Sequence, residues 1–149
     1  MKIAKICAVL AAALLSLVGC NNSLSNGETL GNIDNEWQLI SVNGEEVPFE
    51  VYLSLYDGMF FIYQQVYSWE YLYYEGGYGI SGTTLYGEYV DGTPWKCQYK
   101  CSLSEDGNTL MLKSKEAYPI TCIYEVCVIP DNIKEEAVTR ASADFNYFL

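Results

Sequence analysis

Apolar and polar residues alternate over much of the chain between residues 35 and 129. The clearest alternation covers residues 95–103. One face of this segment would carry Trp95, Cys97, Tyr99, Cys101 and Leu103, and the residues between them are polar. A period of two residues is typical of β-strands that bury one face. The pattern therefore predicts strands, and no segment of this region has the spacing of a long helix.

Turn signals separate the alternating segments. Asn43-Gly44 and Asp57-Gly58 are typical of two-residue hairpin turns, and Ser81-Gly82 is a third turn signal. The predicted strands are Glu36–Val42, Val47–Tyr56, Met59–Val66, Tyr78–Ile80, Thr84–Val90, Trp95–Leu103, Thr109–Lys113 and Ile120–Ile129. Residues 67–75 are aromatic without a clean face, which leaves a bulged strand or a flexible aromatic loop. Gly87, inside a predicted strand, indicates a bend or a close backbone approach.

About eight strands in sequential order predict an all-β domain over residues 35–130. An up-and-down antiparallel barrel removes unpaired edges, so we expect that fold, with an open sandwich as the alternative. Residues 131–149 would form a short helix or tail. The predicted helix is Asp131–Arg140, with Asp131 or Asn132 as its cap and Glu135 and Glu136 in its first turn. The tail ends in Phe145, Tyr147, Phe148 and Leu149.

The first twenty residues have a different pattern. Lys2 and Lys5 precede an apolar run that is too short to span a bilayer, and Leu17–Cys20 follows it. This resembles the lipobox of bacterial lipoproteins, which implies removal of residues 1–19 and an acyl anchor on Cys20. An ordinary secretory signal is the alternative. Residues 20–34 would be a flexible tether. Asn21, Asn22 and Ser23 replace the acidic residues of surface-displayed lipoproteins in the Bacteroidetes, so we expect the outer membrane, facing the periplasm.

Charge and composition exclude several functions. The net charge of −11 opposes binding to nucleic acid or to anionic lipid headgroups. The chain has no histidine, so a Ser-His-Asp triad is impossible and the commonest metal ligand is missing. Carboxylate pairs such as Glu45-Glu46 adjoin turns, where a solvated surface is the simpler interpretation. We therefore expect no enzyme activity and no cofactor.

Four cysteines remain beyond the leader and Cys20. Cys97 and Cys101 would lie about 13 Å apart on one strand, beyond the limit of about 7 Å for a disulfide. Cys122 and Cys127 fail the same limit if their strand is continuous. A bridge across the interior, such as Cys101 with Cys122, is one alternative, and a metal site is a weaker one. Four buried free thiols are the interpretation that we favour.

Several segments resemble the lipocalin-like domains of Bacteroidetes lipoproteins. They are EWQLISVNG at Glu36–Gly44, GYGISGTTLYGEYVDGTPWKCQY at Gly77–Tyr99, LSEDGNTLMLKS at Leu103–Ser114 and IYEVCVIPDNIKEEAVTRAS at Ile123–Ser142. The resemblance implies a lipid-anchored, lipocalin-like barrel that binds a small apolar or aromatic ligand. Asn35 replaces the glycine that stands two residues before the tryptophan in larger lipocalins. The ligands of those lipocalins therefore do not predict the ligand of this chain.

Aromatic side chains are the candidate binding residues. The candidate ligand-binding rings are Trp37, Tyr78, Tyr89, Trp95, Tyr99 and Tyr124. Small barrels either fill their interior with side chains or hold one ligand, and bulky rings favour filling. Two other functions are alternatives to ligand binding. One is an interaction or structural lipoprotein that contacts envelope proteins or glycans through the rings of residues 67–78. The other is a membrane-spanning barrel. The short strand Thr109–Lys113 argues against the latter.

Overall fold

The turn residues of the first half build hairpins, as predicted. The structure is a computed structural model, and it describes residues 30–66 and 68–139. Asn43 and Asp57 have φ values of 53° and 47°, and a glycine with positive φ follows each. This is the backbone of a type I′ turn. The turns join β1 (Asn35–Val42) to β2 (Glu45–Glu46) and β3 (Glu50–Tyr56) to β4 (Met59–Gln65).

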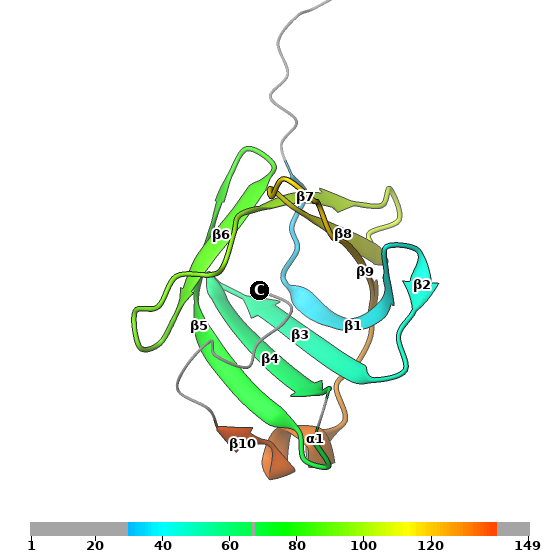
Figure 1. The fold of residues 1–149 in the computed structure, drawn as a ribbon, viewed down its shortest axis with the longest axis vertical. Helices are drawn as coiled ribbons and strands as arrows, with labels where there is room; N and C mark the ends of the chain where they lie inside the picture. The colour runs from blue at the N-terminus through cyan, green and yellow to red at the C-terminus, as the bar shows by residue number, and fades with distance from the viewer. Residues whose placement is uncertain (1–29, 67, 140–149) are drawn as a thin grey trace, which may run out of the picture.

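Five more strands complete a closed barrel (Figure 1). They are β5 (Leu72–Ser81), β6 (Thr84–Tyr89), β7 (Tyr99–Leu103), β8 (Thr109–Ser114) and β9 (Thr121–Val126). Neighbouring strands pair antiparallel, and β9 pairs with β1, so the wall returns to its start. The predicted eight-stranded antiparallel barrel is confirmed, and the sandwich alternative is wrong.

Large rings and leucines fill the wall's inner face. Phe60 is central, with its ring centroid 5.1 Å from that of Trp95 and 5.5 Å from that of Tyr89, both edge-on. Val51, Leu53 and Leu55, which alternate along β3, and Leu110 and Leu112, which alternate along β8, are all buried. Each such side chain contributes roughly 1.5–3 kcal/mol when fully buried, which makes this cluster the main source of stability.

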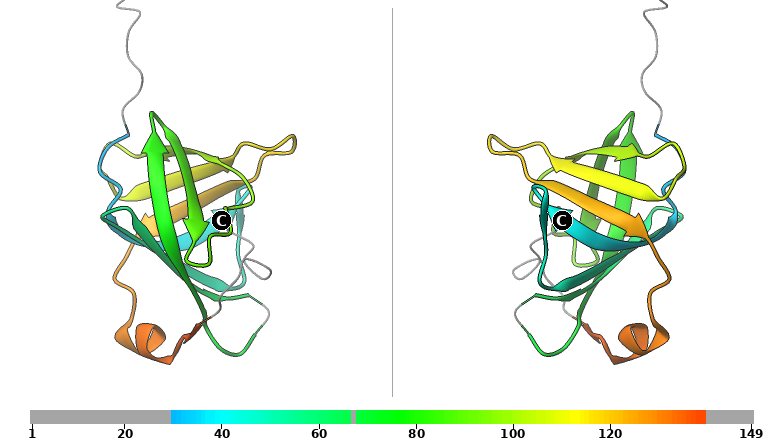
Figure 2. Two further views of the ribbon diagram at one scale, coloured as in Figure 1. Left: turned by 90° about the vertical axis from the view of Figure 1, so that its left-hand side faces the viewer. Right: turned by 90° about the vertical axis from the view of Figure 1, so that its right-hand side faces the viewer.

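The chain before β1 already belongs to the domain. Leu30 packs against the core, and Ile33 is buried in it. The indole N–H of Trp37 donates a hydrogen bond of 3.1 Å to the Ile33 carbonyl. This segment therefore covers one end of the barrel (Figure 2), and the domain begins earlier than Asn35.

A short helix packs on the outside of the barrel, below the wall in both views of Figure 2. Helix α1 (Asp131–Glu136) contributes Ile133 to a second apolar cluster with Tyr52 and Ile129. After α1, β10 (Val138–Thr139) pairs in parallel with the start of β5. Within the described residues, no helix has the length and apolar character to cross a membrane.

Glu36 fixes α1 to the barrel. Its carboxylate forms an ion pair of 2.7 Å with Lys134 and accepts the Ile129 N–H at 2.7 Å. The pKa of Lys134 is raised, mainly by the hydrogen bond with Glu36. The helix is therefore held by a carboxylate of β1 as well as by the apolar cluster of Ile133.

Several predicted element ends are wrong. β3 begins at Glu50 and not at Val47. β7 begins at Tyr99 and not at Trp95. β9 ends at Val126, because the Cys127 N–H donates to the Glu36 carbonyl and the chain then turns toward α1. Val128, which the predicted strand Ile120–Ile129 would have included, is consequently 84% exposed. The helix ends at Glu136, because Ala137 adopts extended backbone and β10 follows.

Two further local predictions are corrected. The N-cap is Pro130 and not Asp131 or Asn132, and Asp131 is the acidic residue of the first turn in place of Glu135 and Glu136. β5 runs without a break through Gly76 and Gly77, so the strand is longer than Tyr78–Ile80. The leader, Cys20, the tether up to residue 29 and the aromatic tail lie outside the described residues.

Candidate functional site

The wall of the barrel has a seam between β6 and β7. Of the residues in these two strands, Thr84 pairs with Lys100 and Leu85 with Tyr99, and beyond them the strands separate. Residues 90–98 then return along β6. The Tyr89 N–H donates to the Thr93 carbonyl at 2.8 Å, and the Trp95 N–H donates to the Gly87 carbonyl at 2.9 Å. The seam is therefore closed by a loop and not by a continuous strand.

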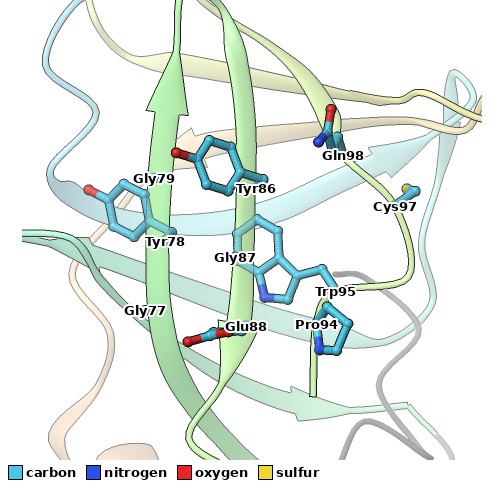
Figure 3. A pocket seen from close by; sticks show the side chains of 10 residues that line it. All are labelled: Gly77, Tyr78, Gly79, Tyr86, Gly87, Glu88, Pro94, Trp95, Cys97 and Gln98. Carbon is cyan, nitrogen blue, oxygen red and sulfur yellow. The ribbon is translucent and has the colours of Figure 1, made fainter. Parts of the chain in front are cut away.

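A groove of about 700 Å³ lies along this seam (Figure 3). Its lining comes from β5, β6 and the returning loop: Gly77, Tyr78, Gly79, Tyr86, Gly87, Glu88, Pro94, Trp95, Cys97 and Gln98. The volume is within the range of about 300–1,000 Å³ that is usual for small-molecule sites.

Two glycines shape the groove by lacking a side chain. A Cβ at Gly79 would lie 2.7 Å from the tip of the Tyr86 ring, so the ring of Tyr86 lies against β5 at this point (Figure 3). A Cβ at Gly87 would lie 2.7 Å from the Trp95 indole and 2.6 Å from the Gly77 carbonyl. The close approach predicted at Gly87 is confirmed.

The three rings of the groove differ in exposure. Trp95 is 5% exposed, and its Nε1 is buried without a hydrogen-bond partner among the described residues. Tyr78 is half-buried, and its hydroxyl donates a hydrogen bond of 2.8 Å to Asp34. Burial, and then this bond, raise the pKa of Tyr78. Tyr86 is 45% exposed, which makes it the most accessible of these rings.

Polar groups lie beside the exposed ring. Glu88 is exposed and shares the outer face of β6 with Tyr86, because the two residues are two positions apart. Gln98 is also exposed, and its backbone is held by the Lys115 N–H at 2.8 Å. Among the residues that line the groove, Glu88 carries the formal charge. The arrangement can stack a flat apolar surface and accept hydrogen bonds.

A second, smaller groove of about 360 Å³ lies where β1 bends away from β3. It is lined by Gln38, Leu39, Ile40 and the segment from Glu46 to Glu50. Tyrosine and tryptophan do not occur among these residues. Its one aromatic ring is that of Phe49, which is half-buried, whereas Tyr86 of the seam groove is exposed.

The predicted ring residues separate into two groups. Trp37, Tyr89, Tyr99 and Tyr124 are buried in the barrel interior. Trp95 and Tyr78 line the groove. Trp95 also packs edge-on against Tyr99 of the core, with ring centroids 6.1 Å apart. The pKa of Tyr99 is raised, first by burial and then by its hydrogen bond with Cys97.

Sequence reasoning missed Tyr86, Glu88 and Gln98. Tyr86 and Glu88 fall on the polar face of the predicted strand Thr84–Val90, and alternation alone does not distinguish a binding residue from an ordinary exposed one. The sequence signal for Tyr86 lies in the pairing of two strands. The Ser81-Gly82 turn fixes a register in which Tyr86 faces Gly79, and a ring opposite a glycine has room to lie flat.

The aromatic stretch before β5 does not form one exposed surface. Trp69 is 98% exposed, whereas Tyr74 is buried. Tyr73 donates a hydrogen bond of 2.6 Å to Glu75, and Tyr71 donates one to Glu50. The rings of this stretch therefore differ in burial and in hydrogen-bond partner, and they do not share one surface.

The four cysteines of the barrel are free thiols. Cys101 and Cys122 are buried and lie in one row across the sheet, separated by Leu112 of β8. Cys97 and Cys127 are half-buried, so burial of all four was wrong. The intervening strand keeps the two interior thiols apart.

Comparison with protein-family models, curated proteins and solved structures finds no match to this chain.

Proposed function

We propose that this protein is a lipid-anchored, non-catalytic binding protein of the cell envelope that holds a small ligand in the seam groove. The observation that carries the proposal is the groove of about 700 Å³ in which Tyr86 exposes its ring beside Glu88 and Gln98. The lipobox-like sequence ending at Cys20 supports the anchor, and the absence of histidine supports a binding role over catalysis.

Native mass spectrometry of the protein purified from its envelope in detergent tests this proposal. We expect a covalent acyl mass on Cys20 and a retained molecule that is lost in Tyr86→Ala. Tyr118→Ala, at a ring that is 90% exposed and away from the groove, should keep it. A protein without any retained molecule, or one that keeps it equally in Tyr86→Ala, would contradict the binding role. A Cys20→Ser protein that still carries acyl mass would contradict the anchor.

A second candidate is an interaction protein with a filled core. Tyr56 is 69% exposed and Met59 is 41% exposed, and they face each other across the β3–β4 hairpin. Nearby, the rings of Phe61 and Tyr73 stack at 6.3 Å on adjacent strands. This outer aromatic face favours contact with an envelope protein. Loss of a co-purifying protein in Tyr56→Ser, with no retained small molecule in the wild type, would favour this candidate.

A further inference from the structure

The orientation of Tyr86 defines what kind of surface the groove offers. Its ring crosses from β6 to β5 and lies against Gly79, where a Cβ would be 2.7 Å from both Cζ and the hydroxyl oxygen. One side of the ring therefore rests on the sheet. Because Tyr86 is still 45% exposed, the other side faces the groove and the solvent. The result is a single flat aromatic platform.

The neighbouring rings do not turn this platform into a cage. Trp95 is nearly buried and packs over Gly87, and Tyr78 is fixed by its hydrogen bond to Asp34. Organic cations such as quaternary ammonium groups are held by several rings that surround them. One open ring face instead suits a ligand that has a flat face of its own.

The charge of the site restricts the ligand further. Glu88 stands beside Tyr86, no lysine or arginine is among the residues that line the groove, and the chain has a net charge of −11. A phosphate or carboxylate ligand would be repelled. The Glu88 carboxylate accepts hydrogen bonds, and the Gln98 amide both donates and accepts them. Hydroxyl groups match this set.

We infer that the seam groove binds a neutral carbohydrate, with one sugar ring stacked on Tyr86 and its hydroxyls bonded to Glu88 and Gln98. The inference rests on the proposed function and names the class of ligand. Sugar rings combine an apolar C–H face with hydroxyls at the edge, and the groove combines an aromatic platform with polar groups at its edge. Gly79 is a positioning residue, because it allows the Tyr86 ring to lie flat.

Binding of the acylated full chain, in detergent, to an array of neutral and acidic glycans tests the inference. We expect at least one neutral glycan to bind, and its Kd to rise about tenfold or more in Tyr86→Ala, which is the size of one lost stacking contact. Glu88→Gln should raise the Kd by about three- to tenfold. Tyr118→Ala and Glu116→Gln, both in the β8–β9 loop, should leave it unchanged.

Gly79→Ala separates positioning from folding. The new methyl group displaces the end of a flexible side chain, so the fold should persist while the Kd rises as in Tyr86→Ala. Failure of every neutral glycan to bind, a preference for acidic glycans, or binding indifferent to Tyr86→Ala would overturn the inference. If the molecule retained from the envelope is not a sugar but still requires Tyr86, the inference is wrong and the proposed function stands.

Discussion

At the residue scale, the absence of a side chain at single positions decides local packing. Gly76 and Gly77 are adjacent in β5, yet their surroundings differ. A Cβ at Gly76 would lie 2.0 Å from the Glu88 carbonyl and 2.7 Å from the Phe60 ring. At Gly77 the nearest atom to such a Cβ would be the Gly58 carbonyl oxygen, 3.8 Å away. Neither glycine has positive φ, so the requirement at Gly76 is for space and not for unusual backbone.

The two glycines therefore give opposite predictions. Gly76→Ala forces β5 and β6 apart and should lower the free energy of unfolding by about 3 kcal/mol, at the upper end of overpacking effects. Gly77→Ala should change it by less than about 1 kcal/mol. Urea unfolding followed by tryptophan fluorescence measures both. Equal losses in the two variants would contradict the close packing of the Glu88 carbonyl and the Phe60 ring against Gly76.

At the element scale, the barrel carries an attached unit that depends on few contacts. Helix α1 has six residues, which is too short to be stable alone. Ile133 anchors it in the cluster with Tyr52 and Ile129, and Glu36 receives both Lys134 and the Ile129 N–H. The helix and β10 should therefore detach together when Glu36 is removed.

Substitutions at the two ends of this ion pair should differ in cost. Lys134→Ala removes a partly exposed ion pair and should lower the free energy of unfolding by about 0.5 kcal/mol. Glu36→Ala also leaves the Ile129 N–H without its acceptor and should cost about 2 kcal/mol. Glu36→Gln keeps an acceptor for the Ile129 N–H, so its loss of unfolding free energy should lie between those of Lys134→Ala and Glu36→Ala. Denaturant unfolding gives the three values, and an equal loss for Lys134→Ala and Glu36→Ala would show that the hydrogen bond to Ile129 contributes nothing.

At the scale of the whole molecule, buried thiols link stability to alkaline pH. Burial raises the pKa of Cys101 to about 12 and that of Cys122 to about 11, from an ordinary value of 9.0. The folded chain therefore retains protons that the unfolded chain releases above pH 9. The contribution of the two thiols to stability should be constant below about pH 8. Between pH 9 and 11 it should fall by up to about 1.4 kcal/mol per pH unit for each thiol.

Urea unfolding at a series of pH values from 7 to 11 measures this slope. The Cys101→Ala, Cys122→Ala double variant is less stable at pH 7 but should have a shallower slope between pH 9 and 10, before the tyrosines contribute. An identical slope in the wild type and the double variant would contradict burial of the two thiols in the interior.

The sequence predicts those parts of the fold that depend on local signals. Asn43-Gly44 and Asp57-Gly58 specify their turns by backbone conformation, and the alternation around Leu53 or Leu110 identifies the inner face. The seam could not be predicted in this way, because Trp95 continues the alternation of β7 but packs against Gly87 from a loop. The platform depends on Tyr86 facing Gly79 across two strands. Such cross-strand relations require the register, which local patterns specify weakly.

Hydrogen exchange on the envelope-purified protein, before and after its retained molecule is removed, tests the central claim most directly. If the seam groove is the binding site, removal should speed amide exchange in residues 86–98 and leave residues 38–50, around the smaller groove, unchanged. A change confined to residues 38–50, or no change anywhere, would contradict the account.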